Sequence, residues 1–170
     1  MRVVRWQSGL HRRERGLPET TWLRESGSLT TRCQRCCRHF EVQVLSQSLQ
    51  AQGVGRRGRV PVREVILRCD GQAVIFARST LSTARSGRLG RWFARLGKRS
   101  LGSLLFRHPG FSRGAMAYAR IRRGDPLHRR IELALGVCPG DVWARRSNYR
   151  FEGIGLELIE VFLPAIRRLG

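Results

Sequence analysis

The segment REVILRCDGQAVIFARS, residues 63–79, constrains the fold more than any other part of the sequence. Two runs rich in β-branched and aromatic residues flank Asp70-Gly71, a dipeptide that favours a two-residue primed turn. Centring the turn on this dipeptide places Arg63 directly opposite Arg78. We therefore predict an antiparallel hairpin with two arginines side by side at the far end of one otherwise apolar face.

The predicted pair of arginines needs an anion nearby. Like charges directly opposite one another in a sheet destabilise it by up to ~1 kcal/mol. A carboxylate of the protein, such as that of Glu64, could lie between the guanidiniums and neutralise them. Alternatively, the two guanidiniums could bind a small dianion, because arginine binds carboxylates through two parallel hydrogen bonds. The sequence leaves both interpretations open.

The last predicted strand, in GLELIEVFLP, carries a carboxyl group on an apolar face. In an extended chain the side chains of Leu158, Glu160 and Phe162 lie on the same face. If this face is buried, Glu160 must pair with a cation or keep its proton at neutral pH. The alternative interpretation is that Glu160 faces solvent at a sheet edge or forms an ordinary structural ion pair.

Hydrophobic periodicity predicts short helices between strands that pair locally. The expected strands are residues 40–47, the hairpin at 62–80, and a second hairpin formed by 143–151 and 156–164 around a turn at 152–155; helical segments are expected at 22–23, 29–33, 89–96, 100–106 and 127–135, with further short helices between 107 and 126. No internal repeat or strand–helix–strand alternation indicates a parallel sheet. We therefore predict an α+β fold with a single antiparallel β-sheet.

The chain of 170 residues is the size of one ordinary domain. We expect a basic, poorly ordered N-terminal arm over residues 1–20, from which Trp6 and Leu10 could dock on the body. A single domain is expected over residues 21–166, followed by a short tail at 167–170.

The formal net charge is +21, from 33 Lys and Arg against 12 Asp and Glu. Such a charge first suggests nucleic acid or an anionic membrane surface as a partner. However, the arginines are spread along the chain, and we find no recognition helix, zinc-finger spacing or aromatic–basic interleaving. A solvated, arginine-rich surface is therefore the favoured interpretation. The sequence also contains no apolar run approaching the ~18 residues of a membrane span and no signal-peptide core, so we expect a cytoplasmic protein.

The cysteines look like a metal motif but lack half of one. In CQRCCRHF, the candidate ligands are Cys33, Cys36, Cys37 and His39. Structural zinc needs four converging ligands, usually as two separated pairs, and no second pair is present. We therefore predict no metal here and expect free thiols for the five cysteines.

Two further motifs are set aside. GVGRRG, residues 53–58, matches the dinucleotide-binding glycine pattern but precedes a strand and opens no helix, so it lacks the context for binding a pyrophosphate. The four histidines show neither metal nor catalytic-triad spacing, and we expect them at the surface. They are His11, His39, His108 and His128.

Five ordered segments resemble the bacterial chorismate lyase family: WLRESGSLTTRC, VREVILRCDGQAVIFARS, LGKRSLGSLLF, WARRSNYRF and ELIEVFLP. RRIELALG also resembles an insertion found in one branch of that family. The resemblance implies an antiparallel sheet with an internal ligand pocket under helical flaps, and no metal or organic cofactor. It implies elimination of pyruvate from chorismate to give 4-hydroxybenzoate, the ring precursor of ubiquinone.

The same resemblance implies a set of site residues. The pocket arginine of the family falls on Arg63 and its pocket glutamate on Glu160, which would be the catalytic pair. Two flap positions that contact the ligand through the main chain fall on Leu29 and Leu101. A further family arginine falls on Arg78, which would attract or hold the second carboxylate of the substrate.

Two other functions remain open from the sequence. The ligand domains of some bacterial transcription regulators resemble this fold, so a non-catalytic sensor of a small aromatic acid is the main alternative. A basic nucleic-acid-binding protein is the second, suggested only by the charge. For the lyase we expect a monomer that needs no nucleic-acid partner, although residues 48–61 are more basic and glycine-rich than the resemblance implies.

Overall fold

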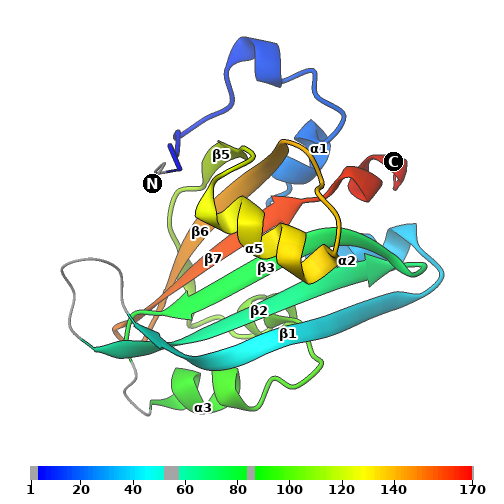
Figure 1. The fold of residues 1–170 in the computed structure, drawn as a ribbon. Coiled ribbons are helices and arrows are strands. Elements are labelled where there is room, and N and C mark those ends of the chain that lie inside the picture. Colours follow the sequence, from blue (N-terminus) through cyan, green and yellow to red (C-terminus); the bar gives the residue numbers. More distant parts are fainter. Residues whose placement is uncertain (1–3, 52–57, 84–86, 170) are drawn as a thin grey trace.

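One antiparallel sheet organises the fold (Figure 1), in a computed structural model that describes residues 4–51, 58–83 and 87–169. Within those ranges the sheet has seven strands: six follow the order β1-β2-β3-β7-β6-β4, and the seventh, β5, pairs with β6. The strands are β1 (Phe40–Ala51), β2 (Arg59–Cys69), β3 (Gln72–Leu81), β4 (Ser112–Arg113), β5 (Ala117–Ile121), β6 (Val142–Phe151) and β7 (Ile154–Phe162). The helices are α1 (Thr20–Leu23), α2 (Leu29–Cys36), α3 (Arg88–Ala94), α4 (Leu101–Leu105) and α5 (Pro126–Leu135), with 3₁₀ turns η1 (Arg12–Glu14) and η2 (Pro164–Arg168). The α+β prediction is confirmed.

Both predicted hairpins form around two-residue turns. Asp70 and Gly71 have φ of 49° and 78°, and Glu152 and Gly153 have φ of 49° and 77°. Positive φ at both central residues is the requirement of the type I′ turn, whose twist matches that of the flanking strands. Local turn chemistry therefore determines where the chain reverses at these two points.

The predicted pairing of Arg63 with Arg78 is wrong. The register of β2 against β3 shifts between Leu67 and Arg68, and beyond this irregularity Arg63 lies opposite Ser79 while Arg78 lies opposite Glu64. Because neighbouring residues of a strand point to opposite faces, the two arginines lie on different faces of the sheet. The irregularity has the effect of a β-bulge, which changes the pairing by one residue.

The two faces of the sheet pack into separate hydrophobic clusters. On one face α5 lies across the strands (Figure 1), with Ile131 packed in a cluster that includes Ile66, Phe76 and Val161. The other face carries a second hydrophobic cluster. It contains Leu29, residues of α1, α3 and α4, and the strand side chains that point away from α5. The sheet thus separates an α5 face from a face covered by several short helices.

The N-terminal segment contacts the body. Gln7 and Tyr118 exchange backbone hydrogen bonds of 2.8 Å in both directions. Leu10 is buried in the larger cluster and Trp6 packs against the smaller one, so the predicted docking of these two side chains is confirmed. Across the described ranges no helix combines the length and apolar character of a membrane span.

The stretch predicted as short helices after residue 106 contains strands instead. Ser112–Arg113 and Ala117–Ile121 both pair with β6. These strands are too short to show an alternating pattern, and β6 supplies the hydrogen-bond partners that fix their conformation. The glycine motif at 53–58 lies outside the described residues except for Gly58.

The expectation of free thiols is wrong for two cysteines. A disulfide joins Cys37, at the end of α2, to Cys69, at the end of β2, whose Cα atoms are 5.5 Å apart. Cys33, Cys36 and Cys138 are free. Burial raises the pKa of the Cys33 thiol to about 12, which keeps it protonated and unreactive.

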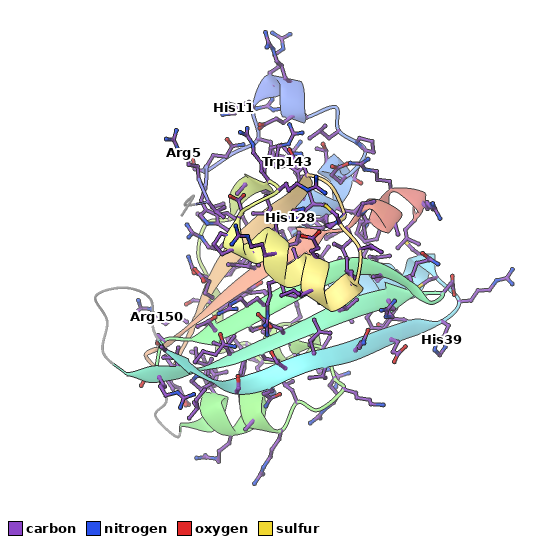
Figure 2. All side chains as sticks on the ribbon, viewed as in Figure 1. Arg5, His11, His39, His128, Trp143 and Arg150 are labelled. Carbon is purple, nitrogen blue, oxygen red and sulfur yellow. A yellow bond between two sulfur atoms is a disulfide. The ribbon has the colours of Figure 1, made fainter. Side chains whose placement is uncertain are left out.

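The expected surface position also fails for one histidine. His11 on the N-terminal segment and His39 at the far end of the sheet are exposed (Figure 2). His108 is half-buried and stacks on Trp92. His128 on α5 is 0% exposed, because this side of the helix packs against the sheet.

Candidate functional site

A small cavity lies between the sheet and the helices that cover its second face. It is lined from β2, β3, β6 and β7 below and from α2 and α4 above, and its volume is about 30 Å³. This space holds roughly two water molecules. Its lining residues are Leu29, Thr30, Arg63, Val65, Leu67, Ala77, Ser79, Ser100, Leu101, Gly102, Leu105, Phe106, Arg145, Tyr149, Leu158 and Glu160.

Arg63 brings a nearly inaccessible positive charge to this cavity, with 1% of its surface exposed. Its Nη2 donates hydrogen bonds to the carbonyls of Gly97, at 2.7 Å, and Arg99, at 3.0 Å, while its Nε has no partner. Burial lowers the pKa of this guanidinium from its ordinary value. Across the described part of the chain, no carboxylate forms an ion pair with Arg63. The charge is therefore held by neutral acceptors alone.

Glu160 also lines the cavity, and it has a cationic partner within the protein. Arg145 Nε lies 2.6 Å from Glu160 Oε2, and both residues are buried. The two residues are directly opposite one another on β6 and β7, so the sheet register fixes their pairing. Arg145 Nη1 donates a second hydrogen bond to the carbonyl of Glu25, which ties the ion pair to the segment before α2.

The cavity has an excess of positive charge. Arg145 neutralises Glu160, whereas Arg63 has no counter-anion. Burial raises the pKa of Tyr149, so its hydroxyl in the wall stays protonated at neutral pH. Such a site could bind a small monoanionic ring, with a carboxylate at Arg63 and a hydroxyl near Glu160.

The roof of the cavity consists of two helix N-termini. Ser28 and Ser100 cap α2 and α4 by accepting hydrogen bonds from Thr31 N and Ser103 N. Leu29 and Leu101 are the first residues of these helices, where backbone N–H groups have no acceptor within the helix. Main-chain donors are therefore available at the edge of the cavity.

The two roof helices touch where a glycine permits close approach. A Cβ atom on Gly102 would lie 3.1 Å from Ser28 Oγ and 3.3 Å from Thr30 Oγ1. With these helices in contact, the cavity is too small for an aromatic acid. A ring-sized ligand therefore needs more space than the sheet and these helices leave here.

The cavity collects four of the five predicted site residues. Leu29, Arg63, Leu101 and Glu160 all line it. Arg78 lines a different hollow, of about 820 Å³, near the other end of the sheet. This placement corrects the expectation that both hairpin arginines face one pocket.

Arg145 is a member of the site that the sequence prediction missed. A turn taken as 152–155 places Ser147 opposite Glu160, but the observed two-residue turn at Glu152-Gly153 places Arg145 there. A Glu-Gly dipeptide between two strand-like runs was therefore the signal that could have identified this partner.

Comparisons with known proteins agree with this architecture. The family model described as "Chorismate lyase" matches residues 2–168. A protein of Dechloromonas aromatica (strain RCB), named "Probable chorismate pyruvate-lyase", is 52% identical over 156 residues, covering 88% of each chain. A protein of the same name from Nitrosomonas europaea is 38% identical over 156 residues, covering 87% of this chain and 88% of its own.

A solved structure shares the fold at low sequence identity. The C-terminal domain of the histidine utilization repressor from Pseudomonas syringae pv. tomato matches with a TM-score of 0.57 and 9% identity, covering 75% of this chain and 93% of that domain. This likeness concerns the fold alone. With the family match over nearly the whole chain and the relatives above, the conclusion is that the chain belongs to the chorismate lyase family.

Proposed function

We propose that this protein eliminates pyruvate from chorismate to give 4-hydroxybenzoate, the ring precursor of ubiquinone. Membership of the family and the names of its relatives support the reaction class. The observation that carries the proposal is the buried guanidinium of Arg63, which has neutral acceptors but no counter-anion. A ring carboxylate would supply the missing negative charge.

The proposed reaction is balanced without an oxidant or reductant. The bond between the ring carbon and the ether oxygen breaks, and its electron pair leaves with the enolpyruvyl group. The neighbouring ring carbon loses its hydrogen as a proton, and that electron pair completes the aromatic ring. The released enolate takes up one proton at its methylene carbon and becomes pyruvate, so no net proton is gained or lost. Aromatisation makes the step strongly favourable, so the protein must mainly orient the substrate and move protons.

Each cavity residue has a distinct proposed role. Arg63 would hold the ring carboxylate by two parallel hydrogen bonds. Glu160 would accept a hydrogen bond from the ring hydroxyl and assist proton transfer, with Arg145 fixing its orientation. The main-chain N–H groups of Leu29 and Leu101 would contact ligand oxygens at the roof. Arg78 is left out of this set because it faces the other side of the sheet.

Movement of the roof helices is part of the proposal. The closed cavity has room for about two water molecules, and the substrate is much larger. We infer that α2 and α4 separate to admit chorismate and close over it, which would exclude water from the reacting atoms.

The test is to mix the purified protein with chorismate and follow both products. 4-Hydroxybenzoate is measured by absorbance, and pyruvate by a coupled lactate dehydrogenase assay. We expect equal amounts of the two products, a severe loss of activity in Arg63→Met and reduced turnover in Glu160→Gln. Arg130→Met, on the α5 face, is the matched control and should retain activity.

Two results would count against the proposal. Wild-type rates in both cavity variants would show that the assigned residues do not carry the reaction. Binding of 4-hydroxybenzoate without any turnover of chorismate would favour the sensor alternative instead.

A further inference from the structure

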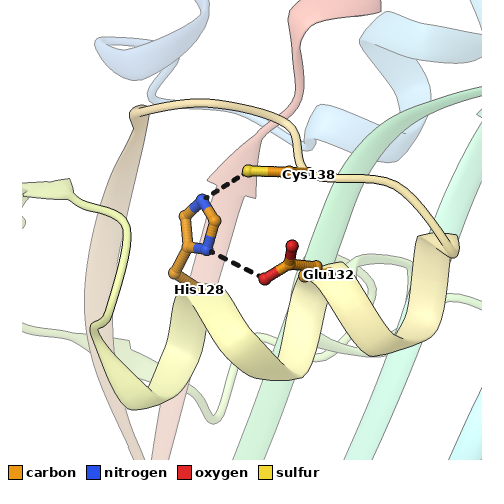
Figure 3. A group of neighbouring side chains, drawn as sticks. All are labelled: His128, Glu132 and Cys138. Atoms are coloured by element: carbon orange, nitrogen blue, oxygen red, sulfur yellow. Dashed lines mark hydrogen bonds and ion pairs between the residues drawn. The ribbon is translucent and has the colours of Figure 1, made fainter.

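Three potential metal ligands come together on α5 and the loop that follows it, on the face of the sheet opposite the cavity. His128 and Glu132 are one helical turn apart, and Cys138 lies in the loop that follows (Figure 3). Gly136 ends the helix in the left-handed region, at φ of 71°, and the loop then returns toward His128. One ligand atom from each residue lies within 4.8 Å of the other two.

The imidazole of His128 is oriented as in many metal sites. Its Nε2 lies 2.8 Å from the carbonyl of Gly140, an acceptor only, so Nε2 carries a hydrogen, and the neutral ring then has its free lone pair on Nδ1. Nδ1 has no hydrogen-bond partner although the residue is fully buried, and the nearest carboxylate oxygen, of Glu132, is 3.9 Å away. A metal-bound histidine typically donates its other N–H to a backbone carbonyl in this way.

We propose that His128 Nδ1, the Glu132 carboxylate and the Cys138 thiolate bind a divalent transition metal of the zinc class. Nitrogen, sulfur and carboxylate oxygen together suit Zn²⁺ or Co²⁺, whereas Mg²⁺ and Ca²⁺ require oxygen ligands. Binding would release the thiol proton of Cys138 to solvent, and water would occupy the fourth position.

The Cys138 side chain must rearrange for binding, because its sulfur lies beside Nε2 and not beside Nδ1. Ligand atoms of a tetrahedral zinc site lie ~3.3–3.6 Å apart, given the usual bond lengths. Nδ1 and the Glu132 oxygen are 3.9 Å apart, and the sulfur of Cys138 lies 3.9 Å from Nε2, so the sulfur must turn toward Nδ1. Glu132 is 42% exposed on its side chain and Cys138 is partly exposed, which leaves both free to rotate toward the fixed imidazole.

The proposed site is separate from the proposed reaction. Its three ligands belong to α5 and the following loop, and none of them lines the cavity with Arg63 and Glu160. A bound metal would instead join α5 to the segment that leads into β6. We therefore expect metal binding to raise the thermal unfolding temperature and to leave chorismate turnover unchanged.

The test uses Co²⁺ as a spectroscopic probe on the full chain, freed of affinity-tag histidines and treated with a chelator. We expect one Co²⁺ per chain at micromolar concentration, with a thiolate-to-cobalt absorption band that Zn²⁺ abolishes. Cys138→Ser should lose the band, and Glu132→Gln should weaken binding by about 10-fold or more. Cys36→Ser is the matched control, because Cys36 is a free, exposed cysteine on α2.

Circular dichroism of each variant checks that it is folded, and both substituted ligands are partly exposed, so folding should be retained. Absence of saturable Co²⁺ binding would overturn the proposal. A thiolate band that persists in Cys138→Ser and disappears in Cys36→Ser would also overturn it, because the metal would then bind at α2.

Discussion

Arg63 and Glu64 are neighbours in β2 and are buried on opposite faces of the sheet, but only Glu64 has partners of opposite charge within the described part of the chain. Glu64 is 0% exposed and accepts hydrogen bonds from Arg130 Nε and Arg78 Nη1, both at 2.7 Å, and from Ser46 Oγ at 3.1 Å. Arg63 is also buried, but its acceptors among the described residues are two backbone carbonyls. The charge of Glu64 is therefore paired within the protein, which we call saturated. The charge of Arg63 has no counter-anion among the described residues, which we call unsaturated.

Under the proposed function, Glu64 has a structural charge and Arg63 a ligand-binding one. A buried ion costs free energy unless it is paired and hydrogen-bonded. Glu64 meets that condition, and its arginine partners link β3 and α5 to β2. Arg63 has no counter-anion among the described residues, and the proposed function assigns that place to the substrate carboxylate.

The largest expected effect on activity follows from removing the unsaturated charge of Arg63. Arg63→Met should lower kcat/KM for chorismate by at least about 100-fold, because charge-assisted hydrogen bonds to a carboxylate contribute roughly 3 kcal/mol. Its free energy of unfolding should stay within about 1 kcal/mol of wild type, since relief of desolvation offsets two lost hydrogen bonds. Steady-state kinetics and urea unfolding measure the two quantities; a large stability loss with little kinetic effect would reverse the assignment.

Removing the saturated charge of Glu64 should reduce stability and leave activity largely unchanged. Glu64→Gln should lower the free energy of unfolding by about 2–3 kcal/mol, because two arginines lose the buried negative charge and one of the two acceptor oxygens is replaced by an NH2 donor. Catalysis by the folded protein should change little, since Glu64 does not line the cavity. If this variant lost activity at full stability, the distinction between the two faces would fail.

A pH dependence should accompany the Glu64 cluster. Burial alone would raise the pKa of Glu64, but the hydrogen bond from Arg130, the charges of Arg78 and Arg130 and the bond from Ser46 lower it below its ordinary value. A lowered carboxyl pKa contributes stability that is present above the unfolded-state value of about 4.3 and is lost as pH falls through the folded-state value. Urea unfolding between neutral and acidic pH should show a steeper acid loss in wild type than in Glu64→Gln; parallel curves would contradict this.

The smallest effect on stability is expected for Arg130, the more exposed of the two arginines that pair with Glu64. The side chain of Arg130 is 46% exposed, so solvent screens its interaction with Glu64. Arg130→Met should therefore cost about 1 kcal/mol or less in unfolding free energy and leave activity unchanged. A loss as large as that of Glu64→Gln would mean that Arg130 alone carries the pairing.

Turn chemistry made the hairpins predictable, whereas the register was not predictable from the same signal. Asp70-Gly71 specifies a primed turn wherever it stands between two strands. The shift between Leu67 and Arg68 has no comparable local signature, and it moves Arg78 to the other face.

The candidate site was predictable where a single residue breaks an apolar pattern. Glu160 stood out because its neighbours on the same face are apolar, and it does line the cavity. Its partner Arg145 and the acceptors of Arg63 come from β6 and from the segment before α4, and no pattern along the chain links them. Tertiary pairing of this kind depends on register and on loop paths that short-range propensity does not determine.

The most direct test of the unsaturated charge compares two ligands that differ only in their acidic group. Isothermal titration calorimetry would measure the binding of 4-hydroxybenzoate and of 4-hydroxybenzamide to wild type and to Arg63→Met. We predict that wild type binds the acid at least about 100-fold more tightly than the amide, and that Arg63→Met loses this preference. Equal affinity for both ligands in wild type, or an undiminished preference in the variant, would contradict the account.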